Sequence, residues 1–205
     1  METEFNKVVL AARIGRLVRW KALAFGLSVC ERMYPVFPIF AERNGHHGVE
    51  VLRVALDGIW TELMAGRDRA DLNSEAKQCM DVAPDMDDYD GLYASAAMDA
   101  ACSTSILLEA MSGDHVSAAA DIASLGWDTV DMLVQQYEDM DSQDPELEAR
   151  ILEHPLMQKE LAHQRLDLEF LESLGNNLAE EAPLLVARWK SVETNMHGLN
   201  TSFGS

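Results

Sequence analysis

The sequence predicts an all-α protein, a single-domain multi-helix bundle with a long central antiparallel helical hairpin. Apolar residues recur at three- and four-residue steps along most of the chain, which is the period of an amphipathic helix. No segment alternates apolar and polar residues over a length useful for a β-strand. The 205 residues contain no internal repeat and no Gly/Ser linker. We therefore expect one domain, large enough to bury a core without a disulfide or a metal.

Proline and glycine separate the expected helices of the first half. One amphipathic helix should run through Arg32, with Leu17, Trp20, Ala24, Leu27 and Tyr34 on its apolar side. Pro35 and Pro38 break it, so a turn or short helix follows up to Asn44 and Gly45. Further helices are expected over residues 49–65, closed by Gly66, and over residues 73–82.

The two longest expected helices span residues 89–112 and 114–138. Gly113 ends the first and Asp114 can cap the second, which makes a tight turn between antiparallel helices. A short helix opening at Asp144-Pro145 and a longer one from His154-Pro155 to about Leu174 follow, because proline suits the first helical turn. We assign residues 1–177 to the bundle, and 178–205 to a C-terminal helix (178–192) and frayed polar tail of the same domain.

Charge and cysteine usage limit the class of protein. The net charge is −19, and residues 54–205 carry thirty acids against eight bases. Such a body repels phosphate backbones, so we expect no nucleic-acid partner. Three scattered cysteines, an acidic N-terminus and the lack of any long apolar run predict a cytoplasmic protein without a membrane partner.

The first 53 residues differ, with eight bases against five acids. The bases Arg13, Arg16, Arg19 and Lys21 cluster within this segment. They either pack against the acidic remainder of the domain, which is the commoner outcome, or contact an acidic partner.

Five ordered segments resemble a known family. They are AFGLSVCERMYPVFPIF (24–40), VLRVALDGIWTEL (51–63), CMDVAPDMDDYDGLYASAAMDAA (79–101), IASLGWDTVDMLVQ (122–135) and DPELEARILEHPLMQKELAHQRLDLEFL (144–171). Together they resemble the YjaG-like family of bacterial proteins, whereas the tail after about Asn176 is less typical. The resemblance implies a cytosolic, all-helical protein of a Gram-negative bacterium. That family has no assigned function or catalytic residues, so the resemblance transfers no role.

Three ionisable residues occupy an unexpected position in the helix that starts at Pro155. On a helical wheel, Glu160, His163 and Asp167 fall within the apolar arc. Buried charges are costly unless they are paired, so a partner should satisfy them.

The hairpin adds further carboxylates. Asp99 lies in a helix of small apolar residues, and Asp128 and Asp131 lie in a polar stripe on the next helix. Asp99 and Asp128 are almost equally far from Gly113, so an antiparallel hairpin places them level. We therefore expect one polar cluster within the bundle. Its candidate residues are Asp99, Asp128, Asp131, Glu160, His163 and Asp167.

Two interpretations of this cluster remain open. Carboxylates and one histidine suit a divalent cation such as Mg²⁺ or Mn²⁺, which would make the protein a metal-dependent hydrolase. Alternatively, an arginine among Arg13, Arg32, Arg53, Arg150 and Arg165 neutralises the acids, and the cluster is structural. No Walker loop, dinucleotide fingerprint, nucleophile elbow or His-Glu-x-x-His motif is present. We therefore favour a regulatory or protein-interaction domain without a cofactor, which binds a protein partner or forms a homodimer.

Overall fold

The computed structural model of the protein describes residues 5–67, 72–89 and 93–189, and these residues form helices and connecting turns without a β-strand. The element order is α1 (Lys7–Ile14), α2 (Arg19–Met33), α3 (Val36–Asn44), α4 (Val49–Met64), α5 (Asn73–Asp81), α6 (Ala94–Ala110), α7 (His115–Tyr137), α8 (Leu147–Glu153), α9 (Pro155–Ser173) and α10 (Leu178–Trp189). The all-α prediction is confirmed. None of the described helices is long and apolar enough to cross a membrane.

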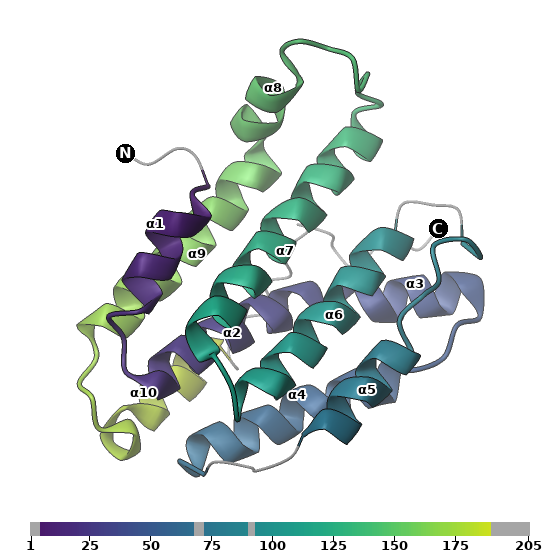
Figure 1. Ribbon diagram of the computed structural model, residues 1–205. Helices are drawn as coiled ribbons and strands as arrows, with labels where there is room; N and C mark the ends of the chain where they lie inside the picture. The colour runs from purple at the N-terminus through teal and green to yellow at the C-terminus, as the bar shows by residue number, and fades with distance from the viewer. Residues whose placement is uncertain (1–4, 68–71, 90–92, 190–205) are drawn as a thin grey trace.

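Helix α2 lies at the centre of the packing. It contacts α4, α6, α7 and α9, while α1 and α9 also cover α7 and α5 covers α6 (Figure 1). Every residue from Lys21 to Cys30 is buried. The predicted amphipathic character of this helix was therefore wrong, because neighbours enclose it on nearly all sides.

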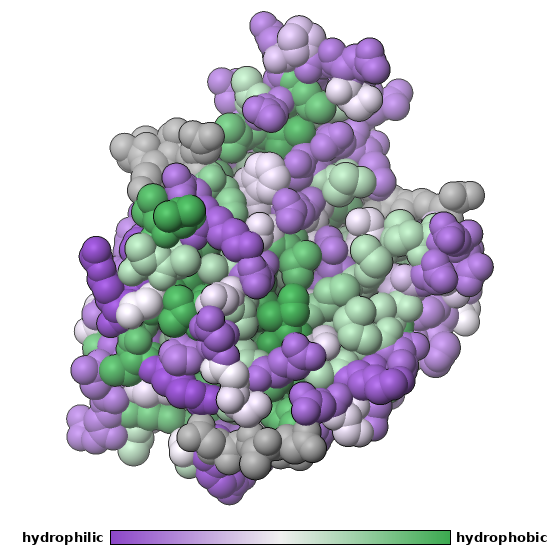
Figure 2. Space-filling view, viewed as in Figure 1, coloured by the Kyte–Doolittle hydropathy of each residue, from purple (hydrophilic) through white to green (hydrophobic). Residues whose placement is uncertain are grey.

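Helices α6 and α7 pack against each other after a short turn at Ser112–Asp114. Asp114 caps α7 by accepting hydrogen bonds from the backbone N–H groups of Val116 and Ser117, as expected. Hydrophobic residues show near the centre of this face of the molecule, and hydrophilic residues surround them (Figure 2). The side chains that pack between the helices are fully buried, among them Phe25, Leu27 and Leu56.

Several boundaries differ from those expected. Helix α1 is separate from α2 and begins with an Asn6 cap that the sequence analysis did not identify. Helix α6 begins at Ala94 rather than residue 89, because Tyr89 instead places its hydroxyl 2.9 Å from Nδ1 of His46. Helix α8 begins at Leu147, after a turn in which Asp144 accepts a hydrogen bond from the N–H of Glu146.

The chain end also bears on the domain assignment. Helix α10 covers the first part of the expected C-terminal helix and contacts α4, whereas residues 190–205 lie outside the described residues. The division into residues 1–177 and 178–205 stays a prediction.

Two glycines between α3 and α4 allow a matched test of packing at this turn. Gly45 and Gly48 both have positive φ, at 62° and 105°. A Cβ atom on Gly48 would lie 2.5 Å from Cβ of Val82, whereas one on Gly45 would meet no atom within 4 Å. We expect Gly45→Ala to lower the free energy of unfolding by about 1 kcal/mol, and Gly48→Ala to lower it by more than about 2 kcal/mol. Urea denaturation measures both, and equal losses would contradict the close approach of Val82.

Candidate functional site

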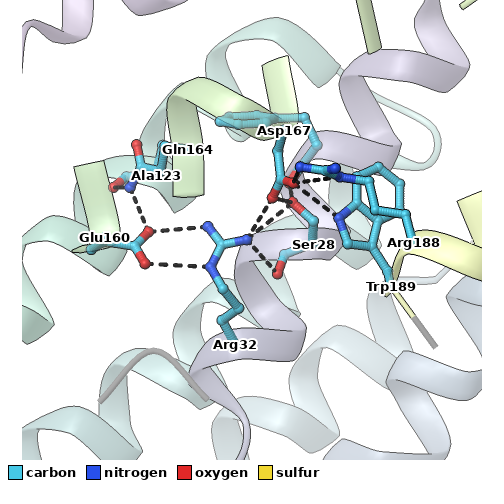
Figure 3. Close-up of polar contacts among 9 residues, drawn as sticks. Ser28, Arg32, Ala123, Glu160, Gln164, Asp167, Arg188 and Trp189 are labelled. Atoms are coloured by element: carbon cyan, nitrogen blue, oxygen red, sulfur yellow. Dashed lines mark hydrogen bonds and ion pairs between the residues drawn. The ribbon is translucent and has the colours of Figure 1, made fainter. Parts of the chain in front are cut away.

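A buried arginine joins two of the predicted acids. Arg32 on α2 donates from Nε and Nη2 to the two carboxylate oxygens of Glu160, at 3.3 and 3.1 Å, and from Nη1 to Oδ2 of Asp167 at 2.7 Å (Figure 3). The exposed fractions of Arg32, Glu160 and Asp167 are 6%, 0% and 3%. The guanidinium group thus lies between two carboxylates that are almost completely buried.

The second carboxylate oxygen of Asp167 accepts hydrogen bonds from side chains of α10. Oδ1 accepts hydrogen bonds from Nε and Nη2 of Arg188 at 3.0 and 2.8 Å, and from Nε1 of Trp189 at 3.1 Å. The Ser28 hydroxyl lies 3.0 Å from Oδ2. Two arginines therefore face two carboxylates, and the group is electrically balanced.

The local sequence explains why α9 presents these acids inward. Glu160, Gln164 and Asp167 are spaced four and three residues apart, so they lie on one face of the helix. Gln164 links that face to α7, because its side-chain amide donates to the Ala123 carbonyl at 3.0 Å and to Glu160 at 2.9 Å. The prediction that Glu160 and Asp167 are buried is thus confirmed.

Asp99 lies on α6, and its hydrogen-bond partner is on α7 and not on α9. It is 8% exposed, and Oδ2 accepts a hydrogen bond of 2.7 Å from the Thr129 hydroxyl. Burial raises the pKa of Asp99 to about 6, against the lowering effect of the Thr129 hydrogen bond, and the charge of Asp128 adds to the rise. Among the described residues, no hydrogen bond or ion pair joins Asp99 to Glu160 or Asp167.

The other predicted residues of the cluster are less enclosed. Asp128 is exposed, and Asp131 is partly exposed and accepts a hydrogen bond from Gln135 on its own helix. His163 is partly buried and lines a cavity of about 270 Å³ beside Arg32 and Arg188. Burial and then the charge of Arg32 lower the pKa of His163, which favours its neutral form.

The alternative interpretation, a divalent cation held by these acids, requires carboxylates that face one another without a basic partner. Arg32 occupies the position between Glu160 and Asp167 that a cation would take, so these carboxylates do not fit a metal centre. No group of three or more His, Cys, Asp or Glu side chains among the described residues is arranged to hold an ion. The structural interpretation, with Arg32 as the neutralising residue, therefore describes the Glu160–Asp167 pair.

The helical pattern predicted the buried acids but not all of the residues that surround them. Arg188, Trp189 and Ser28 were not recognised as members of the network. Arg188 lies in a segment that was assigned only as a last helix, and its spacing from Asp167 gives no local signal. Arg53, another of the five candidate arginines, instead pairs with Asp57 at 3.0 Å and with Glu31 in a bidentate pair.

A second candidate site is an apolar groove along α4, with a volume of about 390 Å³. The lining also includes residues of α5 and the C-terminal end of α6. Its apolar members are Val51, Val54, Ala55, Gly58, Ile59, Leu72, Leu108 and Met111, and its polar members are Glu50, Glu62, Glu75 and Gln78. Val54 is 67% exposed, which is high for a valine in such a lining. We call this feature the α4 groove.

Gly58 leaves space in the α4 groove. A Cβ atom built there meets no atom within 4 Å outside its own helix backbone. Glycine inside a helix costs about 0.5–1 kcal/mol relative to alanine, and the packing around Gly58 does not require its small size.

Comparisons with known proteins agree on one family. The family described as "Protein of unknown function (DUF416)" matches residues 10–187. The "Uncharacterized protein YjaG" of Escherichia coli (strain K12) is 28% identical over 180 residues, which cover 82% of this chain and 90% of that protein. The protein of the same description in Salmonella typhimurium is 29% identical over 136 residues, or 66% of this chain and 69% of that protein.

A solved structure is similar to this chain throughout. The crystal structure of a DUF416 family protein from Shewanella baltica OS155 superposes with a TM-score of 0.83, covering 93% of this chain and 97% of that one at 24% identity. At this identity the likeness shows the fold alone. The family match over residues 10–187 and the YjaG relatives confirm the resemblance found in the five sequence segments.

The buried network makes a prediction about stability. Arg32→Met leaves Glu160 buried without a counter-charge, so we expect it to lower the free energy of unfolding by about 3–5 kcal/mol. The double variant Arg32→Met/Glu160→Met should recover most of that loss, because Asp167 keeps Arg188. Arg165→Met, which removes an exposed ion pair with Glu169, is the control and should cost less than about 1 kcal/mol. A double variant no more stable than Arg32→Met in urea denaturation would contradict this account.

Asp99 predicts a pH dependence. Its folded-state pKa of about 6 lies above the ordinary value of 3.8, so ionisation disfavours the folded state progressively between pH 4 and 6 and fully above that window. Asp99→Asn keeps an acceptor for Thr129 and removes the charge. We expect the variant to be more stable than the parent at pH 7.5, on the order of 1–3 kcal/mol, and to lose this advantage as the pH falls to 4. Thermal unfolding from pH 4 to 8 decides it, and an advantage independent of pH would contradict the assignment.

Proposed function

Since this chain belongs to the DUF416 family of proteins of unknown function, we propose its function from its own surface: it is a protein-interaction domain whose α4 groove binds a basic amphipathic helix of a partner protein. Three properties of the α4 groove support the proposal, namely its spacing, its space at Gly58 and its charge. The cytoplasmic location expected from the sequence is part of the same proposal.

The spacing of the lining residues suits a helix as the ligand. Val51, Val54, Ala55 and Gly58 recur at i, i+3, i+4 and i+7, so they form one stripe along α4. Partner helices that bind in apolar grooves place their anchor side chains with this same period. The stripe covers two turns of α4, and residues of α5 and α6 line the groove beside it. Together they can contact the anchor side chains of one partner helix.

Gly58 is the observation that carries the proposal. Small residues allow two helix backbones to approach closely, and here the space above the glycine is open. The cost of a glycine inside α4 is offset if a partner packs directly over it. In the absence of a partner, an alanine would serve the fold better.

Charge identifies the class of partner. Glu50, Glu62 and Glu75 line the α4 groove, which makes its rim acidic. A chain of net charge −19 attracts cations at long range and repels a second copy of itself. A basic helix of another protein therefore fits this surface better than a homodimer.

Two substitutions at one position separate folding from binding. Gly58→Ala adds a methyl group into open space, so we expect the free energy of unfolding to rise by about 0.5–1 kcal/mol. Gly58→Trp fills the α4 groove, so we expect it to abolish partner binding while the fold remains. Denaturation measures the first effect, and circular dichroism verifies that the tryptophan variant is folded.

Photo-cross-linking in a Gram-negative host identifies the partner. A photo-reactive residue at position 54 should cross-link a protein through a basic amphipathic helix, and a synthetic peptide of that segment should bind the parent but not Gly58→Trp. The control places the same residue at Val186 on α10, which is exposed but outside the α4 groove. A cross-link to a second copy of this chain, or a peptide that binds Gly58→Trp equally well, would overturn the proposal.

A further inference from the structure

Three cationic side chains line a pocket where the connection between α1 and α2 meets the end of α9. The pocket has a volume of about 540 Å³. Its charged residues are Arg13, Arg16, Lys21 and Glu172, and Asn176 adds an amide. We call it the α2 pocket. In a chain of net charge −19, a pocket with more bases than acids is unexpected.

Lys21 is buried without a carboxylate partner. Its exposed fraction is 4%, and Nζ donates to the Leu174 carbonyl oxygen at 2.7 Å. Nζ also lies 5.5 Å from the ring centroid of Trp20. An ammonium group has three protons, and the contacts of the described residues provide no acceptor of a further hydrogen bond and no counter-charge. Buried charges are normally paired, so this group has capacity for an anion.

The arginines of the α2 pocket differ in their partners. Arg13 forms a bidentate ion pair with Glu172, with both N···O distances at 3.0 Å. The side chain of Arg16 is exposed, and no hydrogen bond or ion pair to it occurs within the described parts of the chain. Glu172 therefore offsets one of three positive charges, and Arg16 and Lys21 leave an excess of two.

The start of α2 adds to the positive potential. Val18, the N-cap residue, lines the α2 pocket but its side chain caps nothing, and the first turn contains no acid. Helix N-termini carry a partial positive charge and free N–H groups, both of which favour phosphate. The helix of 15 residues is long enough for this effect.

We propose that the α2 pocket binds the phosphate group of a small molecule. A group with two negative charges balances the excess on Arg16 and Lys21, and guanidinium and ammonium groups are both established phosphate ligands. The volume suits a small metabolite rather than a polymer. A nucleic acid does not fit, because its extended backbone would meet the acids of the surrounding surface. The site is independent of the α4 groove.

Binding is tested on the full chain with inorganic phosphate and with glycerol 3-phosphate as probes, at constant ionic strength set with chloride. We expect a saturable rise in melting temperature with either probe. Arg16→Ser, at an exposed position, should weaken the apparent affinity at least tenfold. Arg165→Ser removes one exposed arginine of α9 that does not line the α2 pocket, and it should leave the affinity unchanged.

Lys21→Met separates a ligand site from a structural contact. If Lys21 serves an anion, the methionine variant keeps its melting temperature in chloride and loses the phosphate-induced rise. A variant that melts much lower in chloride, while its remaining folded protein still responds to phosphate, would contradict the proposal. An equal phosphate response in Arg16→Ser and Arg165→Ser would also overturn it, since that is a general salt effect.

A phosphate group can also belong to a lipid. Vesicles of phosphatidylcholine with and without phosphatidic acid form the second arm of the experiment. Binding to the acidic vesicles that Arg16→Ser abolishes would assign the phosphate to a lipid headgroup, and binding of glycerol 3-phosphate alone would assign it to a soluble molecule. Failure of every probe with the parent protein would overturn the site.

Discussion

Burial of the Arg32 guanidinium group constrains the arrangement of three helices. A charge removed from water is costly, and attraction to opposite charges offsets the cost only when geometry is good and the hydrogen bonds are complete. Arg32 achieves this with Glu160 and Asp167 on α9, and Asp167 is completed in turn by Arg188 and Trp189 on α10. Rotation of α9 by one residue would move both acids through 100° and leave the arginine unpaired. The network therefore fixes the rotation of α9 about its axis, and it attaches α10 to the core.

The sequence located the acids of α9 better than it located those of the hairpin. Glu160 and Asp167 interrupt an apolar arc, and a wheel detects such an interruption directly. Asp99 was placed at the correct level but opposite the wrong residue, because Thr129, one position after Asp128, faces it. Single residues differ by 100° around a helix, so a polar stripe several residues wide does not define which member points inward. The partner arginine was one of five alternatives, since pairing across 128 residues leaves no local pattern.

The two surfaces with proposed ligands lie on different helices, the α4 groove on α4, α5 and α6 and the α2 pocket on α1, α2 and the end of α9. The α4 groove and the α2 pocket are separated by a cavity of about 380 Å³, which shares Glu62 and Met111 with the first and Val18 and Asn176 with the second. Arg19 donates to the Met111 carbonyl oxygen within that intervening region. Bases are concentrated in the first 53 residues and acids in the rest of the chain, and in the fold some of these bases form ion pairs with those acids. Arg13 and Lys7 follow that pattern through Glu172 and Asp121, whereas Arg16 and Lys21 do not.

The distance in sequence between Arg32 and its partners has a consequence for synthesis on the ribosome. The ribosome synthesises Arg32 long before Glu160, Asp167 and Arg188. In a nascent chain that contains only α1 to α8, Arg32 therefore lacks the two carboxylates that pair with it in the folded protein. Without α9, the partial chain lacks both the apolar side chains that cover α2 and the carboxylates that neutralise Arg32. Contacts of such long sequence separation form late and fold slowly. We therefore expect the partial chain to be a client of chaperones that protect exposed apolar segments until the final helices emerge.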